Sequence, residues 1–191
     1  MEQEVNNTRP NSSRVFFNDG DFKLPDAVAH LVFWPLFVVG FTLDLWSKWV
    51  VFKWLETKSG YSVSVVDGFF QLVMAQNAGA AFGIAAGKRG LLVIVSVIAL
   101  LAIIGVFLFG QVRKRMVHVA LALFAAGICG NLYDRIFNQG LVRDFLDVYY
   151  GHYHWPAFNV ADSLLCIAVG LLVISSFVTE KPCQRHVQPH K

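Results

Sequence analysis

The chain has 191 residues, of which 55% are apolar and only 15% charged, and its mean hydropathy is +0.52. Soluble domains carry about 25% charged residues, so this composition excludes an ordinary soluble domain and indicates a membrane protein. The formal net charge of +3 comes from scattered basic residues without an aromatic–basic groove pattern, so we predict no nucleic-acid partner.

The chain opens with a polar stretch, residues 1–27, which lacks the short apolar region of a signal peptide. We predict a disordered tail there, a transmembrane domain at 28–178 and a second polar tail at 179–191. Apolar segments lie at residues 27–55, 90–110, 116–133 and 157–178. A helix needs about 20 such residues to cross the hydrocarbon core, and it satisfies its own backbone in lipid. The predicted fold class is therefore an all-α membrane protein with four transmembrane helices.

The connections between these segments differ in kind. Residues 56–86 contain "YSVSVVDGFFQLV", whose alternation and Asp-Gly pair indicate a small β element. Residues 136–156 are aromatic and mildly amphipathic, and Tyr and Trp favour the membrane–water interface. We therefore predict an interfacial segment there.

The short turn at 111–115, "QVRKR", contains three basic residues and should face the cytoplasm. With four spans, both tails lie on that side, and most polar residues near the spans fall on the opposite side. These residues are Asp44, Lys48, Asn77, Asn131, Asp134, Arg135, Asp144, Asn159 and Asp162. Scattered structural residues would not be expected to gather on one face, so the pattern indicates a functional site.

Asp162 lies near the start of the last apolar segment, on one helical stripe with Asn159, Ser163 and Cys166. We expect this stripe to face protein rather than lipid. An ionisable residue inside a span indicates function. The alternative is an acid that merely benefits from the helix dipole.

Asp144 is the candidate partner of Asp162, from which it lies 18 residues upstream in the mainly apolar "LVRDFLDVYY". Two carboxylates held close together share a proton, so one can act as a base and the other as an acid. From spacing alone, Asp134 and Asp147 remain alternative partners.

Other polar clusters have structural interpretations beside functional ones. Asp44 and Lys48 lie one helical turn apart and can neutralise each other. Asn131, Asp134 and Arg135 share one helix face, where a charge cluster at a helix end is the alternative to function. Small residues at 126 and 130 allow a close approach of helices.

We predict neither a metal site nor a cofactor. Cys129, Cys166 and Cys183 form no CxxC pair. His152 and His154 have an aromatic setting that favours a surface position over metal binding.

Two other functions would also explain part of the pattern. A small transporter places acids within its spans, but it usually shows internal repeats with broken helices, and this sequence shows no repeat. A structural scaffold would not need carboxylates that converge on one face.

Five motifs, in order, resemble those of the lipoprotein signal peptidases, also called signal peptidase II. They are "DLWSK" (44–48), "NAGAAFG" (77–83), "AGICGNLYDR" (126–135), "VRDF" (142–145) and "FNVADS" (158–163). The resemblance implies a membrane-embedded aspartic endopeptidase of the bacterial inner membrane, with four transmembrane helices and a small periplasmic β-cradle. Such an enzyme removes the signal peptide from diacylglyceryl-modified prolipoproteins, just before the lipid-modified cysteine.

The resemblance also assigns roles to residues. It implies catalysis by Asp144 and Asp162. It implies contacts with the substrate, or with the inhibitor globomycin, at Asn77, Asn131, Arg135 and Asn159. It implies structural support from Asp44, Lys48, Asp134 and Gly130.

Further expectations concern partners and one departure from the family. The expected partners are the prolipoprotein and membrane lipids, and we expect a monomer. Arg143 stands where family members often have an aliphatic residue, and its charge would lower the pKa of Asp144 if the two were close.

Overall fold

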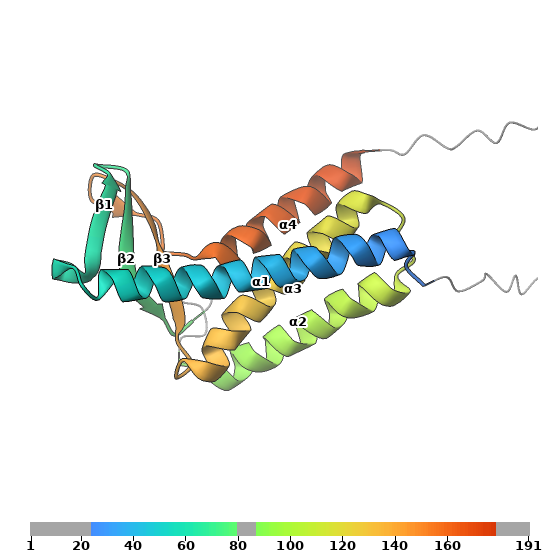
Figure 1. Cartoon of the computed structure of the whole chain (residues 1–191), viewed down its shortest axis with the longest axis horizontal. Coiled ribbons are helices and arrows are strands. Elements are labelled where there is room, and N and C mark those ends of the chain that lie inside the picture. The colour runs from blue at the N-terminus through green and yellow to red at the C-terminus, as the bar shows by residue number, and fades with distance from the viewer. Residues whose placement is uncertain (1–23, 80–86, 179–191) are drawn as a thin grey trace, which may run out of the picture.

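The structure is a computed structural model that describes residues 24–79 and 87–178. Within these residues, four α-helices form a bundle, and a four-stranded antiparallel sheet lies at one end of it (Figure 1). Residues 1–23 and 179–191 of the predicted tails lie outside the described residues. So do Cys183 and residues 80–83 of the "NAGAAFG" motif.

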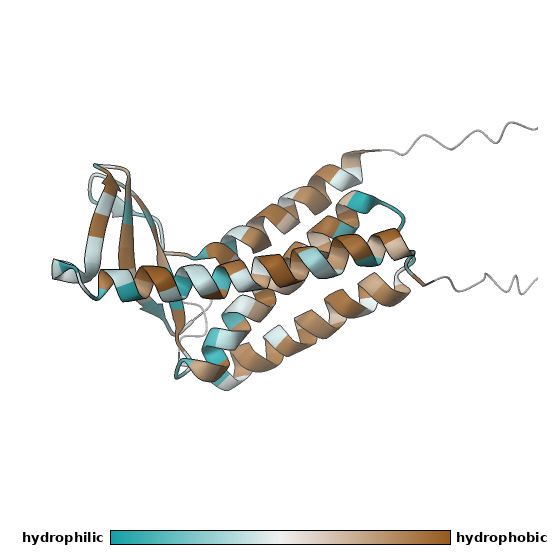
Figure 2. Cartoon of the chain, viewed as in Figure 1, coloured by the Kyte–Doolittle hydropathy of each residue, from teal (hydrophilic) through white to brown (hydrophobic). Residues whose placement is uncertain are grey.

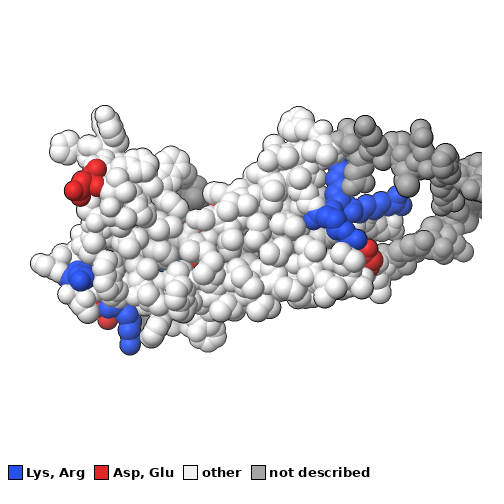
Figure 3. Space-filling model, turned by 45° about the horizontal axis from the view of Figure 1, so that its top comes forward, with Lys and Arg blue, Asp and Glu red and all other residues white. Residues whose placement is uncertain are grey.

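All four helices are long and apolar enough to cross a membrane, which confirms the prediction of four transmembrane helices. They are α1 (Ala27–Leu55), α2 (Arg89–Phe109), α3 (Arg115–Phe137) and α4 (Val160–Phe177). Their residues are mainly hydrophobic along the length of the bundle (Figure 2). Charged side chains gather at the two ends of the molecule, and the face between them is almost free of charge (Figure 3).

Helix α3 is the centre of the bundle. It packs against α1, α2 and α4. In its most apolar 18-residue stretch, 56% of the residues are buried, compared with 6% in the corresponding stretch of α2. Small residues allow the helices to approach closely, since a Cβ added at Gly127 would lie 2.6 Å from the Ala161 carbonyl oxygen on α4. The exposed apolar surface of α2 suits contact with lipid.

Helix α1 is longer than the membrane requires. Its 29 residues span roughly 44 Å at about 1.5 Å per residue, against a hydrocarbon core of about 30 Å. Its last turns therefore extend beyond the other helices and contact the sheet (Figure 1). This extension connects the sheet to the bundle.

The basic turn before α3 binds the ends of two other helices. Asp26 caps the start of α1 and forms a 2.7 Å ion pair with Arg115. Lys114 donates from Nζ to the carbonyl oxygens of Ser175, at 2.7 Å, and Val178, at 2.6 Å. The lysine thus satisfies carbonyls that the end of α4 would otherwise leave unpaired.

The sheet combines two distant parts of the chain in the order β1-β2-β3-β4. Strands β1 (Ser62–Val66) and β2 (Phe70–Asn77) form the hairpin expected within 56–86, and Gly68 in its turn has φ +78°. Strand β3 (Val142–Tyr150) pairs with β2, and the short β4 (Tyr153–His154) pairs with β3.

The sheet is therefore larger than the sequence indicated. Most of the expected interfacial segment at 136–156 forms β3 and β4 instead of a separate element. Val, Phe and Tyr favour strands, and β3 covers an edge of β2 that would otherwise expose unpaired backbone groups.

Candidate active site

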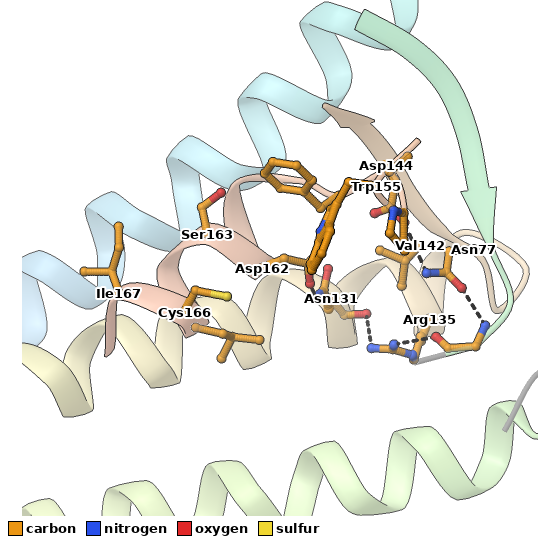
Figure 4. A pocket seen from close by; sticks show the side chains of 15 residues that line it. Asn77, Asn131, Arg135, Val142, Asp144, Trp155, Asp162, Ser163, Cys166 and Ile167 are labelled. Atoms are coloured by element: carbon orange, nitrogen blue, oxygen red, sulfur yellow. Dashed lines mark hydrogen bonds between the residues drawn. The ribbon is translucent and has the colours of Figure 1, made fainter. Parts of the chain in front are cut away.

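The predicted polar residues meet where the sheet joins the bundle. A cavity of about 660 Å³ opens there between β2, β3, α3 and α4 (Figure 4). Five of the predicted residues lie on its wall: Asn77, Asn131, Arg135, Asp144 and Asp162. These five residues lie on four separate elements, so only the folded chain forms the cavity.

Asp144 lies on β3 and is 2% exposed. Its two carboxylate oxygens accept hydrogen bonds from two side-chain amides. Asn159 donates to Oδ1 at 2.6 Å, and Asn77 donates to Oδ2 at 3.2 Å. The carboxyl group is therefore held from both sides.

Asp162 lies in the first turn of α4, in a capping box with Asn159. The Asn159 side chain accepts from the Asp162 backbone N–H at 3.0 Å, and Asp162 Oδ2 accepts from the Asn159 backbone N–H at 3.2 Å. Asn is a preferred N-cap residue, so the helix begins here for a local reason. The other oxygen of Asp162 accepts from Asn131 Nδ2 at 2.8 Å. The acid thus serves the helix start and also faces the cavity.

The environment of Asp144 favours its protonated form. Burial, and then the negative charge of Asp162, raise the pKa of Asp144 to about 7. The amides of Asn77 and Asn159 and the charge of Lys48 act in the opposite direction, but burial outweighs them. A proton shared by the two aspartates is therefore favoured on Asp144.

The two alternative partners are occupied elsewhere. Asp147 lies three residues after Asp144 on β3, so its side chain lies on the opposite face of the strand, where Gln71 and His154 bind it. Asp134 binds Lys48 and Arg143. The structure thus brings Asp144 together with Asp162.

Asn159 differs from its expected role in substrate contact. It is 0% exposed and does not lie on the cavity wall. Its amide nitrogen is close to three acceptors: Asp144 Oδ1, Asn131 Oδ1 and the Arg143 carbonyl oxygen, at 2.6, 3.1 and 3.3 Å. Asn159 thus binds both aspartates from behind the cavity wall.

Arg135 supplies a positive charge to the cavity wall. It is 8% exposed, and its terminal nitrogens donate to the carbonyl oxygens of Asn131, at 3.3 Å, and Gly79, at 3.1 Å. Its Nε has no hydrogen-bond partner, and no carboxylate lies within 4.0 Å of the guanidinium among the described residues. A group that brings partial negative charge into the cavity would find this cation available.

A fully buried ionic cluster lies behind the cavity wall. Lys48 on α1 contacts Asp44 at 2.7 Å and Asp134 at 3.3 Å, and it donates to Asn131 Oδ1 at 3.1 Å. Lys48, Asp44 and Asp134 are all 0% exposed. The cluster therefore links α1 to the α3 residue that holds Asp162.

Gly130 provides the space for this cluster. A Cβ at this position would collide with Oδ2 of Asp44. The other oxygen, Oδ1 of Asp44, accepts from the Ala161 backbone N–H at 2.8 Å, in the first turn of α4. Because Gly130 on α3 has no side chain, Asp44 on α1 can reach between the helices and bind the start of α4.

Arg143 points away from its neighbour Asp144. Its guanidinium lies 2.6 Å from Asp134 Oδ1, and its backbone N–H donates to Asp134 Oδ2 at 3.0 Å. The condition for a lowered pKa of Asp144, a close approach by the Arg143 guanidinium, is therefore not met, because Asp134 binds that guanidinium. Burial and the charge of Asp162 raise the pKa instead.

Some wall residues were not predicted from the sequence. Trp155, Pro156 and Phe158 line the cavity before α4 begins, and Cys166 lines it one turn beyond Asp162. The Trp-Pro pair two residues before the "FNVADS" motif was an available signal for Trp155. The stripe of Asp162, Ser163 and Cys166 was expected to face protein, and it faces this cavity.

Comparison with known proteins identifies the family. The model of the family described as signal peptidase (SPase) II matches residues 36–178. A lipoprotein signal peptidase of Halalkalibacterium halodurans is 36% identical, over 81% of this chain and 97% of the relative. A lipoprotein signal peptidase of Syntrophus aciditrophicus is 44% identical, over 73% of this chain and 88% of the relative.

Two solved structures, both described as a bacterial membrane enzyme, share the fold. One has a TM-score of 0.64 at 31% identity and covers 78% of this chain and 87% of its own. The other has a TM-score of 0.63 at 30% identity, with 80% and 94% covered. These matches favour the enzyme over the transporter and the scaffold. The chain belongs to the signal peptidase II family, which its five sequence motifs predicted.

Proposed function

We propose that the chain is an aspartic endopeptidase that removes the signal peptide from diacylglyceryl-modified prolipoproteins, just before the lipid-modified cysteine. Its family membership and its relatives named lipoprotein signal peptidase support this substrate. The observation that carries the mechanism is the link that Asn159 makes between Asp144 and Asp162 at one cavity.

In the proposed reaction, ionised Asp162 takes a proton from a water molecule as the water oxygen attacks the scissile carbonyl carbon. Protonated Asp144 donates a hydrogen bond to the carbonyl oxygen and then gives its proton to the leaving amine as the C–N bond breaks. Asp162 has then gained one proton and Asp144 has lost one. A proton transfer from Asp162 to Asp144 restores the starting state of the pair. No metal or cofactor is needed, because the carboxylate pair activates the water.

Arg135, Asn77 and Asn131 are proposed to bind the peptide. The guanidinium of Arg135 lies on the cavity wall without a carboxylate partner in the described part of the chain, so its charge suits the oxyanion that develops on the carbonyl. The buried cluster of Asp44, Lys48 and Asp134, with Gly130 beside it, supports the pair from behind.

The proposed location is the bacterial inner membrane, with both tails in the cytoplasm. The basic turn at 111–115 then faces the cytoplasm, and the sheet and the cavity lie at the periplasmic surface, where the bond to be cut emerges from the bilayer. Membrane lipids surround the helices, the protein acts as a monomer, and globomycin inhibits it at the same cavity.

The test is cleavage of a synthetic diacylated peptide by the detergent-purified protein. Asp144→Asn and Asp162→Asn should each reduce turnover below detection while the protein remains folded. The matched control is Asp67→Asn in the exposed turn between β1 and β2, which should retain wild-type turnover. Near-normal turnover in either cavity variant would remove that residue from the catalytic pair.

A further inference from the structure

A second polar cluster lies on the face of the sheet opposite Asp144. Asp147 on β3 is 5% exposed, and its Oδ2 accepts from Gln71 Nε2 at 2.6 Å and from His154 Nδ1 at 2.8 Å. Its Oδ1 has no hydrogen-bond partner within 24–79 and 87–178. A buried carboxylate with so few donors depends strongly on each of them.

The histidine is held in a defined orientation. An ionised carboxylate only accepts hydrogen bonds, so the imidazole has its proton on Nδ1 when it donates to Asp147. The ring also stacks on Tyr149, with centroids 5.1 Å apart and planes inclined by 11°. These contacts fix the side chain of His154 although it is about half exposed.

The backbone at His154 is held by a very short strand pairing. Strand β4 has only 2 residues, and Tyr150 and Tyr153 in its hairpin are 82% and 85% exposed. Such a short hairpin is marginal without side-chain contacts. The contact between Asp147 and His154 therefore adds a side-chain hydrogen bond to the backbone pairing that holds β4 on β3.

The residue after His154 is Trp155, which lines the cavity with Asp144 and Asp162 although it is 60% exposed (Figure 4). The backbone N–H of Trp155 donates to the Val148 carbonyl oxygen at 2.8 Å. The following Pro156 confines Trp155 to extended conformations. On the other side of Trp155, Phe158 exchanges backbone hydrogen bonds with Leu146 at 2.9 Å. The indole is thus held from both sides of the chain, and the contact of His154 with Asp147 contributes the support on one side.

We propose that Asp147 and His154 are positioning residues, which hold Trp155 against the cavity so that its indole binds the substrate beside the catalytic pair. This inference rests on the proposed function for its substrate. The pair contacts neither the peptide nor Asp144, so it acts on the affinity for the substrate and not on the chemical step.

The kinetic test uses the diacylated peptide and the full chain. His154→Ala should raise KM about tenfold, as expected when a hydrogen bond to a charged group is lost, and should leave kcat within about twofold. His154→Gln, whose amide can still donate to Asp147, should restore most of the affinity. His152→Ala, two residues away in the same hairpin, is the matched control and should behave as wild type.

A double-mutant cycle tests whether the effect passes through Trp155. In a Trp155→Ala background, His154→Ala should cause no further rise in KM. The same rise in both backgrounds, or a rise no larger than that of His152→Ala, would overturn the proposal.

A spectroscopic readout keeps this test separate from the proposed function. The chain has 5 tryptophans, so ¹⁹F NMR with fluorotryptophan should give five signals, and Trp155→Phe assigns one of them. His154→Ala should shift or broaden that signal alone, and His154→Gln should restore it. An unchanged signal overturns the positioning role even if the wild type cleaves the peptide. A wild type that fails to cleave overturns the proposed function instead.

Discussion

Asn159 donates its side-chain amide to Oδ1 of Asp144 at 2.6 Å, although the two residues lie on different elements. The same Asn159 begins α4 and forms the capping box with Asp162. One asparagine therefore sets the start of a transmembrane helix and the placement of both carboxyl groups.

Substitutions at Asn159 can separate these two tasks. Asn159→Ser retains an oxygen that can cap the helix but loses the amide that binds Asp144. We expect a loss of about 1–3 kcal/mol of stability, because the buried Asp144 loses a donor. The kcat should fall roughly 10²-fold, in the range of general acid–base effects. Turnover of the peptide and thermal unfolding in detergent give the two measurements.

Asn159→Ala is the companion variant, because it loses the cap as well. It should match the serine variant in kcat and be less stable by about 1 kcal/mol, the typical value of an N-cap. If the two variants were equally stable, or if the serine variant kept the wild-type kcat, the proposed separation of helix capping from the binding of Asp144 would be wrong.

The raised pKa of Asp144 predicts how activity depends on pH. Because that pKa is about 7, Asp144 holds its proton below this pH and loses it above. We expect kcat to fall about tenfold per pH unit on the alkaline side, since one proton is lost. A flat kcat between pH 7 and 9 would exclude Asp144 as the acid.

The raised pKa of Asp144 also makes the stability of the folded protein depend on pH. The folded chain binds this proton more tightly than the unfolded chain, in which the pKa is near the ordinary 3.8. The free energy of unfolding should therefore fall as the pH rises from 3.8 to about 7. Asp144→Asn should remove this part of the decline, which thermal unfolding of both proteins at pH 4.5 and 7.5 would reveal.

Gly130 should not tolerate even alanine. The new Cβ would displace the Asp44 carboxylate from the buried ionic cluster, and we expect a loss of about 1–3 kcal/mol, as for other overpacked cores. Gly170→Ala in α4 is the matched control, because no atom lies within 4 Å of its added Cβ. In thermal unfolding, Gly170→Ala should have nearly the wild-type unfolding temperature, and Gly130→Ala should have a clearly lower one.

The proposed orientation can be tested by labelling cysteines from outside intact cells, in a chain whose native cysteines are replaced by serine. Asp67→Cys in the exposed β1–β2 turn should react with a membrane-impermeant reagent. Arg113→Cys in the exposed basic turn should react only after the cells are opened. The reverse pattern would place the sheet in the cytoplasm.

The sequence alone determined the features that depend on neighbouring residues. The apolar length of each span predicted all four helices, because a helix in lipid satisfies its backbone within its own segment. The spacing of Asn159 and Asp162, one helical turn apart, put both at the start of α4 for the same local reason. The order of the five motifs was sufficient to identify the family.

Only the tertiary structure decided which distant residues meet. Asp144 binds Asn77, which lies 67 positions earlier in the chain. The two residues meet because β3 pairs with β2. The sequence did not indicate this pairing. The alternation of side chains along β3 then turned Asp147 away from Asp144, where the sequence had left both as candidates. Arg143 likewise binds Asp134 rather than affecting Asp144. These contacts depend on which elements pair, and the residue spacing within one segment does not show which distant segment it will pair with.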